Sequence, residues 1–403
     1  MTEKNTEPFF PESLSLRAYT PEEFLAGLQR LIQSPQLPKI AQHYFPDLPY
    51  DRFVQVLKTV KNVDDFQAQF ISTAIHTVLK KTSRGLTVSG LENLSKKQKY
   101  LFISNHRDII CDPALLTNSL FLNGYPTPQI CLGDNLLSHP LIVDLVKMNK
   151  GITVKRTRSP RELLASSREL SEFIFDQING DIDSVWIAHR EGRAKDGNDR
   201  TQQGILKMFT LSRESPFLDR LQQLHLVPVA ISYEYDPCDA LKARELHILS
   251  TQQEYRKSPN EDTQSIIRGI TEFKGRIHIA VDEDLTMKMD SFRKLSNPRD
   301  QMKAVVDELD HRIHKNYRLW PSNYIAYDLL EGSAALSNST QVQALLYTNQ
   351  EKEEFIDRME NQLQKLSPGE GSPAETAAIR NQFLSSYAFP VRNALSLQQG
   401  LLS

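Results

Sequence analysis

Residues 101–113 read Leu-Phe-Ile-Ser-Asn-His-Arg-Asp-Ile-Ile-Cys-Asp-Pro, and this stretch organises the chain. Its apolar start, from Tyr100, is typical of a short buried strand, and Asp112-Pro113 has the residue types of a helix N-cap followed by a first-turn proline. His106 is therefore predicted at the carboxyl end of a strand, where open α/β sheets place their sites. We take His106 as a candidate catalytic residue. The alternative is a loop histidine beside a carboxylate that only caps a helix.

On both sides of this stretch, short β-rich runs alternate with helical patterns. Seven strands are predicted, at Leu86–Ser89, Tyr100–Ser104, Gln129–Leu132, Ile152–Lys155, Ser184–Ala188, Leu226–Tyr233 and Arg276–Val281. Helices are predicted at 113–122, 139–149, 160–179 and 201–213, and a last one at 299–317. This alternation is typical of an α/β fold with a mostly parallel central sheet flanked by helices. We assign it to a domain over residues 85–329.

Helical patterns precede this domain. After a loose extension over 1–19, the segment 20–23 (Thr-Pro-Glu-Glu) has the form of a capping box with proline at the first helical position. Apolar residues at helical spacing continue to Val78. The sequence therefore predicts an N-terminal helical domain over 1–84. Its apolar stripes are interpreted mainly as core, with membrane contact or a cover over the site as the alternative.

A second helical region is predicted at the other end. Residues 366–373 (Leu-Ser-Pro-Gly-Glu-Gly-Ser-Pro) are rich in residues that interrupt helices, and both flanks of this break have helical patterns. Residues 330–403 are therefore predicted to form a helical C-terminal extension.

Composition excludes several classes of protein. A chain of 403 residues with a net charge of -2 is long enough for two or three domains and is not a general polyanion binder, so no nucleic acid is expected as a main partner. The three cysteines, Cys111, Cys131 and Cys238, have no metal-ligand spacing and are too few for a disulfide framework. They are expected to be buried in a protein of a reducing compartment, and no metal is expected.

No apolar run approaches the roughly 18–20 residues of a membrane span, and the start has no signal-peptide core. A cytoplasmic location is therefore expected. Peripheral contact with the inner face of the membrane stays open, because interfacial binding needs only an amphipathic face and a few cations. The apolar segment Asp134–Lys147 is the candidate for such contact, and an ordinary sheet-covering helix is its alternative interpretation.

A second polar block follows the predicted strand at 152–155. Lys155 and Arg156 form a cationic pair at the strand end, with Arg158 and Arg161 close behind. Arginine binds phosphate through two parallel charge-assisted hydrogen bonds, so Arg156 is a candidate anchor for a phosphorylated alcohol. A solvated surface loop is the alternative.

A third polar block follows the predicted strand at 184–188. It contains Arg190, Glu191, Gly192 and Arg193, in which a carboxylate between arginines can bind hydroxyls while the arginines hold an anion. Glycine here permits close approach of a ligand to the backbone. A surface network of ion pairs on a turn is the alternative interpretation.

The fourth block, Leu226–Tyr233, is a strand that contains Pro228. Because proline cannot donate a hydrogen bond to a ladder, Pro228 is expected at a strand end, an edge or a bulge.

The order and spacing of the four blocks resemble the glycerophospholipid acyltransferase family over residues 85–285. The chain is similar in particular to glycerol-3-phosphate and 1-acylglycerol-3-phosphate (lysophosphatidic acid) acyltransferases. Its N-terminal helical region resembles that of the soluble plastid-type enzymes. The resemblance implies a glycerol-3-phosphate acyltransferase-like fold and transfer of a fatty acyl group from acyl carrier protein or coenzyme A to a hydroxyl of glycerol 3-phosphate or lysophosphatidic acid.

The resemblance also implies roles for individual residues. His106 matches the general base that takes the proton of the attacking hydroxyl, and Asp112 matches the carboxylate that orients the ring. By this resemblance the second and third motifs bind the phosphate and glycerol of the acceptor, and the fourth motif is linked to the acyl side of the site. The substrate-binding candidates are Lys155, Arg156, Arg190, Glu191, Gly192, Arg193 and Pro228. No cofactor is implied other than the acyl thioester as co-substrate.

Two departures from the family pattern leave assignments open. Five residues separate His106 from Asp112 where the family usually has four, so Asp108 is a rival partner for the histidine. The third motif is one residue shorter than usual between glycine and arginine. Either Arg193 shifts, or another cation of this loop takes part of the phosphate role; the candidates are Arg190, Lys195 and Arg200. We interpret the chain as a divergent branch.

Three alternatives to this activity are considered. The first is an acyltransferase for another polar lipid, such as an aminolipid. The second is a hydrolase that cleaves thioesters or lysolipids, which lacks support because the sequence has no Gly-x-Ser-x-Gly elbow. The third is a catalytically silent lipid-binding or scaffold protein, suggested by the altered spacing between histidine and aspartate.

Overall fold

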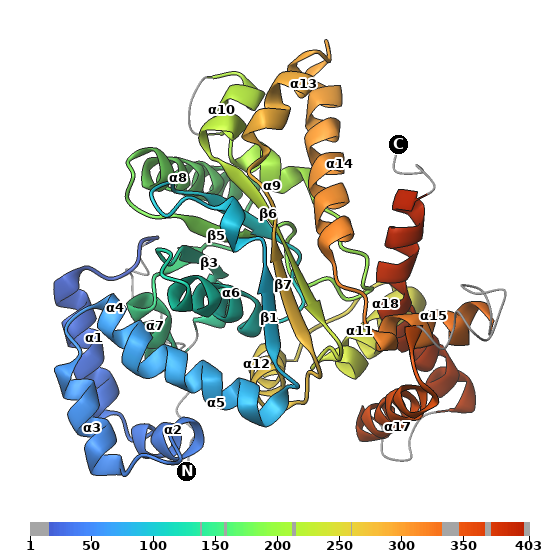
Figure 1. Cartoon of the computed structure of the whole chain (residues 1–403), viewed down its shortest axis with the longest axis horizontal. Helices are drawn as coiled ribbons and strands as arrows, with labels where there is room; N and C mark the ends of the chain where they lie inside the picture. The colour runs from blue at the N-terminus through green and yellow to red at the C-terminus, as the bar shows by residue number, and fades with distance from the viewer. Residues whose placement is uncertain are drawn as a thin grey trace.

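The computed structural model describes residues 16–137, 139–156, 159–211, 215–258, 260–332, 346–366 and 372–398. A seven-stranded sheet lies at its centre, with helices on both faces and further helices at the two ends of the chain (Figure 1). Residues 1–15 of the predicted extension over 1–19 lie outside the described residues, as do Arg158 and most of the predicted break at 366–373.

All seven predicted strands are present, with ends shifted by at most one residue. They are β1 (Leu86–Ser89), β2 (Leu101–Ser104), β3 (Gln129–Gly133), β4 (Gly151–Val154), β5 (Val185–Ala188), β6 (Leu226–Tyr233) and β7 (Ile277–Val281). Their order across the sheet is β1-β7-β6-β2-β5-β3-β4. The pair β6–β7 is antiparallel and every other neighbouring pair is parallel. The predicted α/β fold with a mostly parallel sheet is confirmed.

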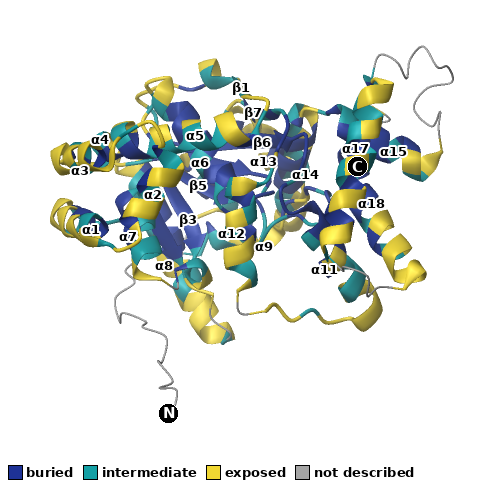
Figure 2. Ribbon diagram, turned by 90° about the horizontal axis from the view of Figure 1, so that it is seen from below, coloured by how far each residue is buried: buried dark blue, intermediate teal, exposed yellow. Residues whose placement is uncertain are grey.

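Alternate side chains of the strands enter two cores, one on each face of the sheet. In β2, Leu101 and Ile103 belong to one core and Phe102 to the other, as the two-residue period of a strand requires. The first core is closed by α8 (Pro160–Asn179), α9 (Gln203–Met208), α10 (Phe217–Gln223), α13 (Met289–Arg293) and α14 (Pro298–Asn316). The second is closed by α5 (Ser72–Thr82) and α6 (Cys111–Leu122). Figure 2 shows the buried sheet between helices whose outer surfaces are exposed.

The predicted helices of this region are found, although α9 ends at Met208, well before the predicted 213. Residues 212–214 lie outside the described part of the chain. Four helices were not predicted: α10, α11 (Asp239–Gln252), α12 (Glu261–Thr271) and α13. In α11 the buried side includes Asp239, Lys242 and Glu245, so the sequence carries no clear apolar stripe.

Pro228 lies inside β6, which is an interior strand, not an edge strand. The missing N–H is tolerated because the ladder with β7 ends there. The first paired residues are Val229 and Val281, and beyond them the Asp282 N–H donates to the Pro228 carbonyl at 2.9 Å. Pro228 therefore lies neither at a strand end nor at an edge of the sheet, as the sequence suggested, but beside the point where the ladder with β7 ends.

The N-terminal helices are α1 (Pro21–Gln33), α2 (Leu37–Tyr44), α3 (Tyr50–Thr59) and α4 (Val63–Phe66), which a π-helical turn, η1 (Gln67–Ile71), joins to α5. The predicted capping box at Thr20 and Glu23 is confirmed. These helices share an apolar core with α7 (Pro140–Met148), and Arg30 of α1 binds Asp144 of α7 at 2.6 Å. The segment proposed for membrane contact is thus packed against α1.

The C-terminal helices are α15 (Pro321–Glu331), α17 (Asn349–Leu366) and α18 (Pro373–Gln398). Their apolar core includes Tyr235 and the α11 residues Ala240 and Ala243. Both helical regions therefore share cores with the α/β region, and the boundaries at 84 and 329 stay predictions. None of the described helices is long and apolar enough to span a lipid bilayer.

Candidate active site

His106 lies directly after β2, and its ring is fixed by a carboxylate. The Nδ1 atom of His106 lies 2.8 Å from Oδ2 of Asp112, which is fully buried, whereas the His106 side chain keeps 14% of its exposure. The indole of Trp186 packs edge-on against the imidazole, with ring centroids 5.8 Å apart. The structure thus places the predicted His106–Asp112 pair in direct contact despite the extra residue between them.

Asp112 is not the helix N-cap that the sequence suggested. It lies in the first turn of α6, and its Oδ2 accepts the backbone N–H groups of Arg107 (2.6 Å) and Asp108 (3.0 Å) besides facing His106. Its Oδ1 accepts the hydroxyl of Tyr233 at 2.7 Å. The contacts of Oδ2 are thus with His106 and the loop that follows it, and the contact of Oδ1 is with β6.

Asp108, the rival partner, takes the capping role. Its Oδ1 accepts the N–H groups of Ile110 (3.0 Å) and Cys111 (2.7 Å) at the start of α6. Burial, and secondly the Asp112 carboxylate, raises the pKa of Asp108 above its usual value. Gly269 of α12 leaves room for this side chain, because a Cβ there would overlap it. In this longer loop, two different aspartates therefore make the two sets of contacts. Asp108 caps the start of α6, and Asp112 contacts His106.

A cavity of about 510 Å³ opens beside His106, and residues at the carboxyl ends of β2, β3, β4 and β5 and from the helices α8 and α9 line it. Cations from the second and third motifs lie along one part of its wall, namely Lys155, Arg156 and Arg190. Other parts are apolar, with Leu132, Leu136, Val154, Leu170, Ile205 and Met208. The cavity therefore combines a base, a cationic region and an apolar region.

Five of the seven predicted binding residues line this cavity: Lys155, Arg156, Arg190, Glu191 and Gly192. Arg156 is exposed and its guanidinium lies over Gly133, where a Cβ would approach its Nε to 2.7 Å. Gly192 has φ +69°, a backbone conformation that favours glycine. Pro228 does not line the cavity, so its link to the acyl side stays a prediction.

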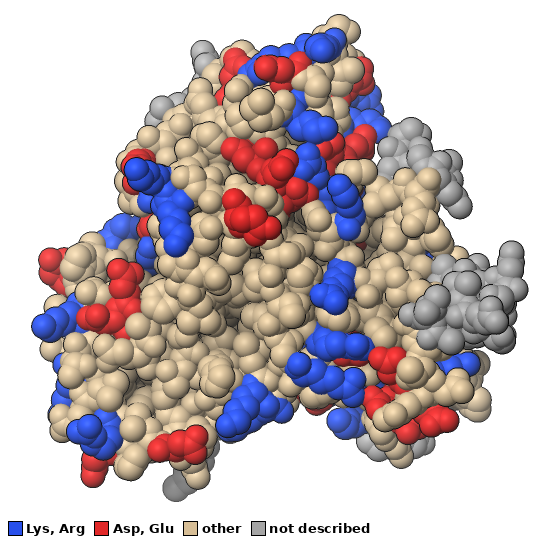
Figure 3. Space-filling model, viewed as in Figure 1, with Lys and Arg blue, Asp and Glu red and all other residues tan. Residues whose placement is uncertain are grey.

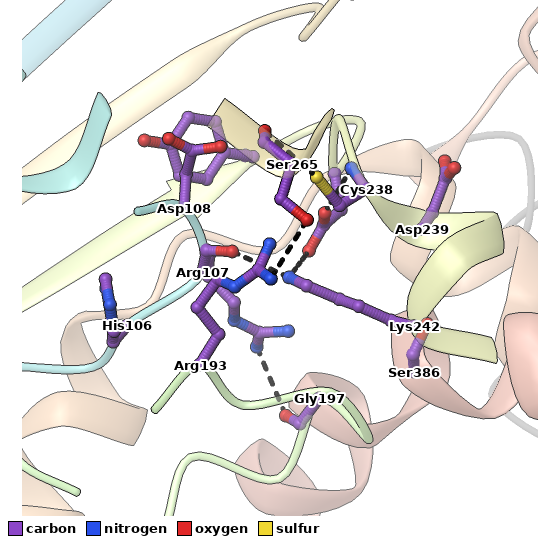
Figure 4. Close-up of polar contacts among 12 residues, drawn as sticks. His106, Arg107, Asp108, Arg193, Gly197, Cys238, Asp239, Lys242, Ser265 and Ser386 are labelled. Atoms are coloured by element: carbon purple, nitrogen blue, oxygen red, sulfur yellow. Dashed lines mark hydrogen bonds and ion pairs between the residues drawn. The ribbon is translucent and has the colours of Figure 1, made fainter. Parts of the chain in front are cut away.

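The sequence grouped Arg193 with the other binding residues of the third motif, but Arg193 does not line the His106 cavity. Its Nη2 donates to Ser265 Oγ of α12 at 3.2 Å, and Figure 4 shows its side chain directed toward Ser265. It lines a separate polar cavity between α11 and α12. The turn at Gly192 puts consecutive cations on different sides of the loop, and Arg190 takes the place beside His106.

The other two candidate cations of this loop are also engaged elsewhere. Lys195 pairs with Glu245 of α11, and Nη1 of Arg200 lies 3.5 Å from Asp310 of α14. Neither lines the His106 cavity.

A buried network that the sequence did not reveal holds the His106 loop. Arg107 binds Asp199 at 2.6 Å. It also donates to the Gly197 carbonyl at 3.1 Å, and its own carbonyl accepts Nζ of Lys242 at 2.7 Å (Figure 4). Asn105 also donates to Asp199, at 3.2 Å. These polar residues are far apart in the sequence, and only the strand order brings them together.

The acyltransferase family model matches residues 85–232, which run from the start of β1 almost to the end of β6. Over this segment the chain is similar to the acyltransferase family. The matched segment contains His106, Asp112 and all the cations that line the cavity.

Among solved structures, the chain is similar to the 1-acyl-sn-glycerophosphate (LPA) acyltransferase PlsC from Thermotoga maritima. The two are 13% identical, the match covers 73% of this chain and 93% of that one, and the TM-score is 0.35. No curated protein matches the chain.

The three cysteines of the chain lie in its interior. Cys111, Cys131 and Cys238 are buried as predicted, and burial raises the pKa of each thiol. Cys111 directs its Sγ to the Gly269 carbonyl at 3.2 Å. Within the described ranges, no group of three His, Cys, Asp or Glu side chains could hold a metal ion.

Proposed function

We propose that this acyltransferase moves a fatty acyl group from an acyl thioester of coenzyme A or acyl carrier protein to a hydroxyl of glycerol 3-phosphate or lysophosphatidic acid. The observation that carries the proposal is the His106–Asp112 contact of 2.8 Å at the wall of a cavity that also holds arginines and an apolar region.

His106 acts as the general base. With Nδ1–H donated to Asp112, Nε2 is the ring nitrogen left to accept a proton from the acceptor hydroxyl. The hydroxyl oxygen attacks the thioester carbonyl carbon, the new C–O bond forms, and the C–S bond then breaks. The proton held on Nε2 leaves with the thiolate, so the histidine returns to its neutral form. A positioned base of this kind contributes about 10²–10⁴ in rate.

Asp112 supports this step by fixing the ring and by stabilising the imidazolium that forms. The carboxylate is fully buried and receives hydrogen bonds from two backbone N–H groups and from Tyr233. Because these donors hold it in place before the reaction, little reorganisation accompanies proton transfer.

Arg156 and Arg190 bind the acceptor's phosphate. Each guanidinium can form two parallel hydrogen bonds with phosphate oxygens, and both residues line the same cavity as His106. Lys155 adds a third positive charge, partly compensated by Glu169 at 3.6 Å. This arrangement favours a phosphorylated glycerol over a neutral acceptor.

The apolar part of the cavity holds the acyl chain. It lies against α8 and α9, where Leu170, Ile205 and Met208 face the ends of the strands. Burial of a hydrocarbon chain here provides binding free energy remote from the reacting carbonyl, which helps to position it.

The test measures free thiol released from long-chain acyl-coenzyme A and acyl carrier protein with glycerol 3-phosphate, lysophosphatidic acid, an aminolipid or water as acceptor. We expect release that depends on a phosphorylated acceptor and disappears in folded His106→Ala. Release with water alone would favour a hydrolase, and release only with the aminolipid would name that acceptor instead. No release from either donor would favour a silent lipid-binding protein.

A further inference from the structure

We propose that the N-terminal tip of α8 docks on an anionic lipid surface and places the mouth of the His106 cavity against the membrane. The α8 tip is defined by four residues: Arg161, Leu163, Leu164 and Arg168. The inference rests on the proposed function, because docking at this place would let an acceptor in the membrane enter the cavity. The observations that support docking are independent of that function.

The first observation is an exposed pair of leucines. Leu163 and Leu164 keep 49% and 51% of their exposure. Single exposed apolar side chains are ordinary on protein surfaces. In the described part of the chain, however, no other two large exposed apolar residues are consecutive. Every residue of α8 from Arg161 to position 165 is exposed. Figure 2 shows exposed residues along this helix.

The second observation is the position of the pair. Leu163 lines the His106 cavity, as do Ser166, Ser167 and Leu170 farther along α8. Leu164, one residue on, is not among the residues that line the cavity. Leu163 thus extends the apolar lining of the cavity to the protein surface, and Leu164 adds an exposed apolar side chain beside it.

The third observation is charge. Leu164 shares a helix face with Arg161 and Arg168, three residues before it and four after it, and both arginines are exposed. Over residues 155–168 the sequence has five Lys or Arg and one Glu, although the whole chain carries a net charge of -2. On the face in Figure 3, by contrast, cations and carboxylates are interspersed.

Leucines flanked by arginines match a membrane interface, since the apolar side chains enter the acyl boundary while the cations meet anionic headgroups. An acidic protein would satisfy the arginines as well. The lipid surface is favoured because Leu163 joins the exposed leucine pair to a cavity with a partly apolar wall.

The experiment is co-sedimentation of the full chain with phosphatidylcholine vesicles with and without phosphatidylglycerol. We expect binding that requires phosphatidylglycerol and falls about tenfold in Leu164→Glu. Arg161→Glu with Arg168→Glu should abolish the preference for anionic vesicles. The matched control is Ile267→Glu, on α12, where the native side chain keeps 54% of its exposure; it should bind as the wild type does.

Equal loss in Ile267→Glu and Leu164→Glu, or no vesicle binding by the wild type, would overturn the proposal. Binding of acyl carrier protein that is lost in Leu164→Glu, with vesicles left unbound, would overturn it in favour of a protein partner. Thiol release with soluble glycerol 3-phosphate distinguishes the membrane-docking proposal from the proposed function. Leu164→Glu should keep that activity and lose activity on vesicle-embedded lysophosphatidic acid, whereas absence of release in every arm would reject the proposed function and leave the vesicle result intact.

Discussion

Tyr233, the last residue of β6, donates its hydroxyl to Oδ1 of Asp112 at 2.7 Å, while Oδ2 of the same carboxylate faces His106. Burial, and secondly the nearby Asp112, raises the pKa of Tyr233 well above its usual value, so the hydroxyl remains a donor. The tyrosine thus acts on the histidine through the carboxylate. It is a positioning residue that sequence motifs did not single out.

Replacement of Tyr233 by phenylalanine removes this hydrogen bond with little change in volume. We expect kcat to fall about tenfold, equivalent to about 1.4 kcal/mol, because the buried Asp112 oxygen loses its donor. The KM values for donor and acceptor should stay the same, since Tyr233 does not line the cavity. Steady-state kinetics on the variant, with circular dichroism as the control for folding, provides the test. A raised KM at unchanged kcat would contradict the positioning role.

Isosteric substitutions distinguish the roles of the two aspartates near His106. Asp112→Asn should lower kcat by about 10²–10⁴, because the amide no longer stabilises the imidazolium. Asp108→Asn should keep most of the activity, since an amide oxygen can still cap α6. Thiol-release rates of both variants decide the assignment, and the reverse ranking would make Asp108 the partner of His106.

Much of the fold could be predicted because each strand is a short apolar run between turn residues. The roles at the site were harder to predict, since they depend on which atoms a loop brings together. Asp108 and Asp112 both lie near the start of α6, and only the observed hydrogen bonds distinguish capping from histidine contact. Tyr233 reaches Asp112 because β6 is the neighbour of β2, and strand order is not encoded locally.

The positions of the arginine side chains were also difficult to predict from the sequence. Arg190 and Arg193 are three residues apart in one motif, but the loop at Gly192, with φ +69°, sends them into different cavities. The backbone N–H of Ala194 donates to the His106 carbonyl at 2.8 Å and fixes that loop. The resemblance in the third motif identified this loop as part of the site. The directions of its arginine side chains could be determined only from the structure.

Substitution of the arginines tests this difference. Arg190→Ala and Arg156→Ala should each raise the KM for a phosphorylated acceptor by about tenfold or more, because a charge-assisted hydrogen bond to phosphate is lost. Arg193→Ala should leave that KM nearly unchanged. The measurement is KM for glycerol 3-phosphate in all three variants. If Arg193→Ala gave the largest increase, the phosphate would bind on the α12 side.

Gly197 tests whether α18 supports the third-motif loop. This glycine has φ +78°, and an added Cβ would overlap the Ser386 carbonyl of α18. Gly197→Ala should therefore lower the free energy of unfolding by about 2 kcal/mol or more. Gly204→Ala, in α9, meets open space and should be neutral or slightly stabilising. Urea unfolding of both variants is the measurement, and equal stability of the two would show that the loop and α18 separate easily.

Stability should depend on pH through His189. This residue is fully buried, and burial lowers its pKa to about 3 from the ordinary 6.5. Between these values the unfolded chain binds a proton that the native protein does not. Stability is therefore lost as pH falls below about 6.5, by up to about 1.4 kcal/mol per pH unit from this group.

The measurement for His189 is the free energy of unfolding at pH 7 and pH 5 in the wild type and in His189→Asn. The variant should lose less stability on acidification. His76→Asn, at an exposed position, should behave as the wild type does. A wild-type slope preserved in His189→Asn would assign the acid sensitivity to other groups.

The central claim is that His106, oriented by Asp112, catalyses acyl transfer to a phosphorylated glycerol. Its most direct test is mass spectrometry of the acceptor after incubation of the purified full chain with an isotopically labelled acyl thioester and glycerol 3-phosphate or lysophosphatidic acid. The account predicts labelled acyl ester on the acceptor with the wild type and none with folded His106→Ala. Labelled free fatty acid without acylated acceptor, or the same ester from His106→Ala, would contradict it.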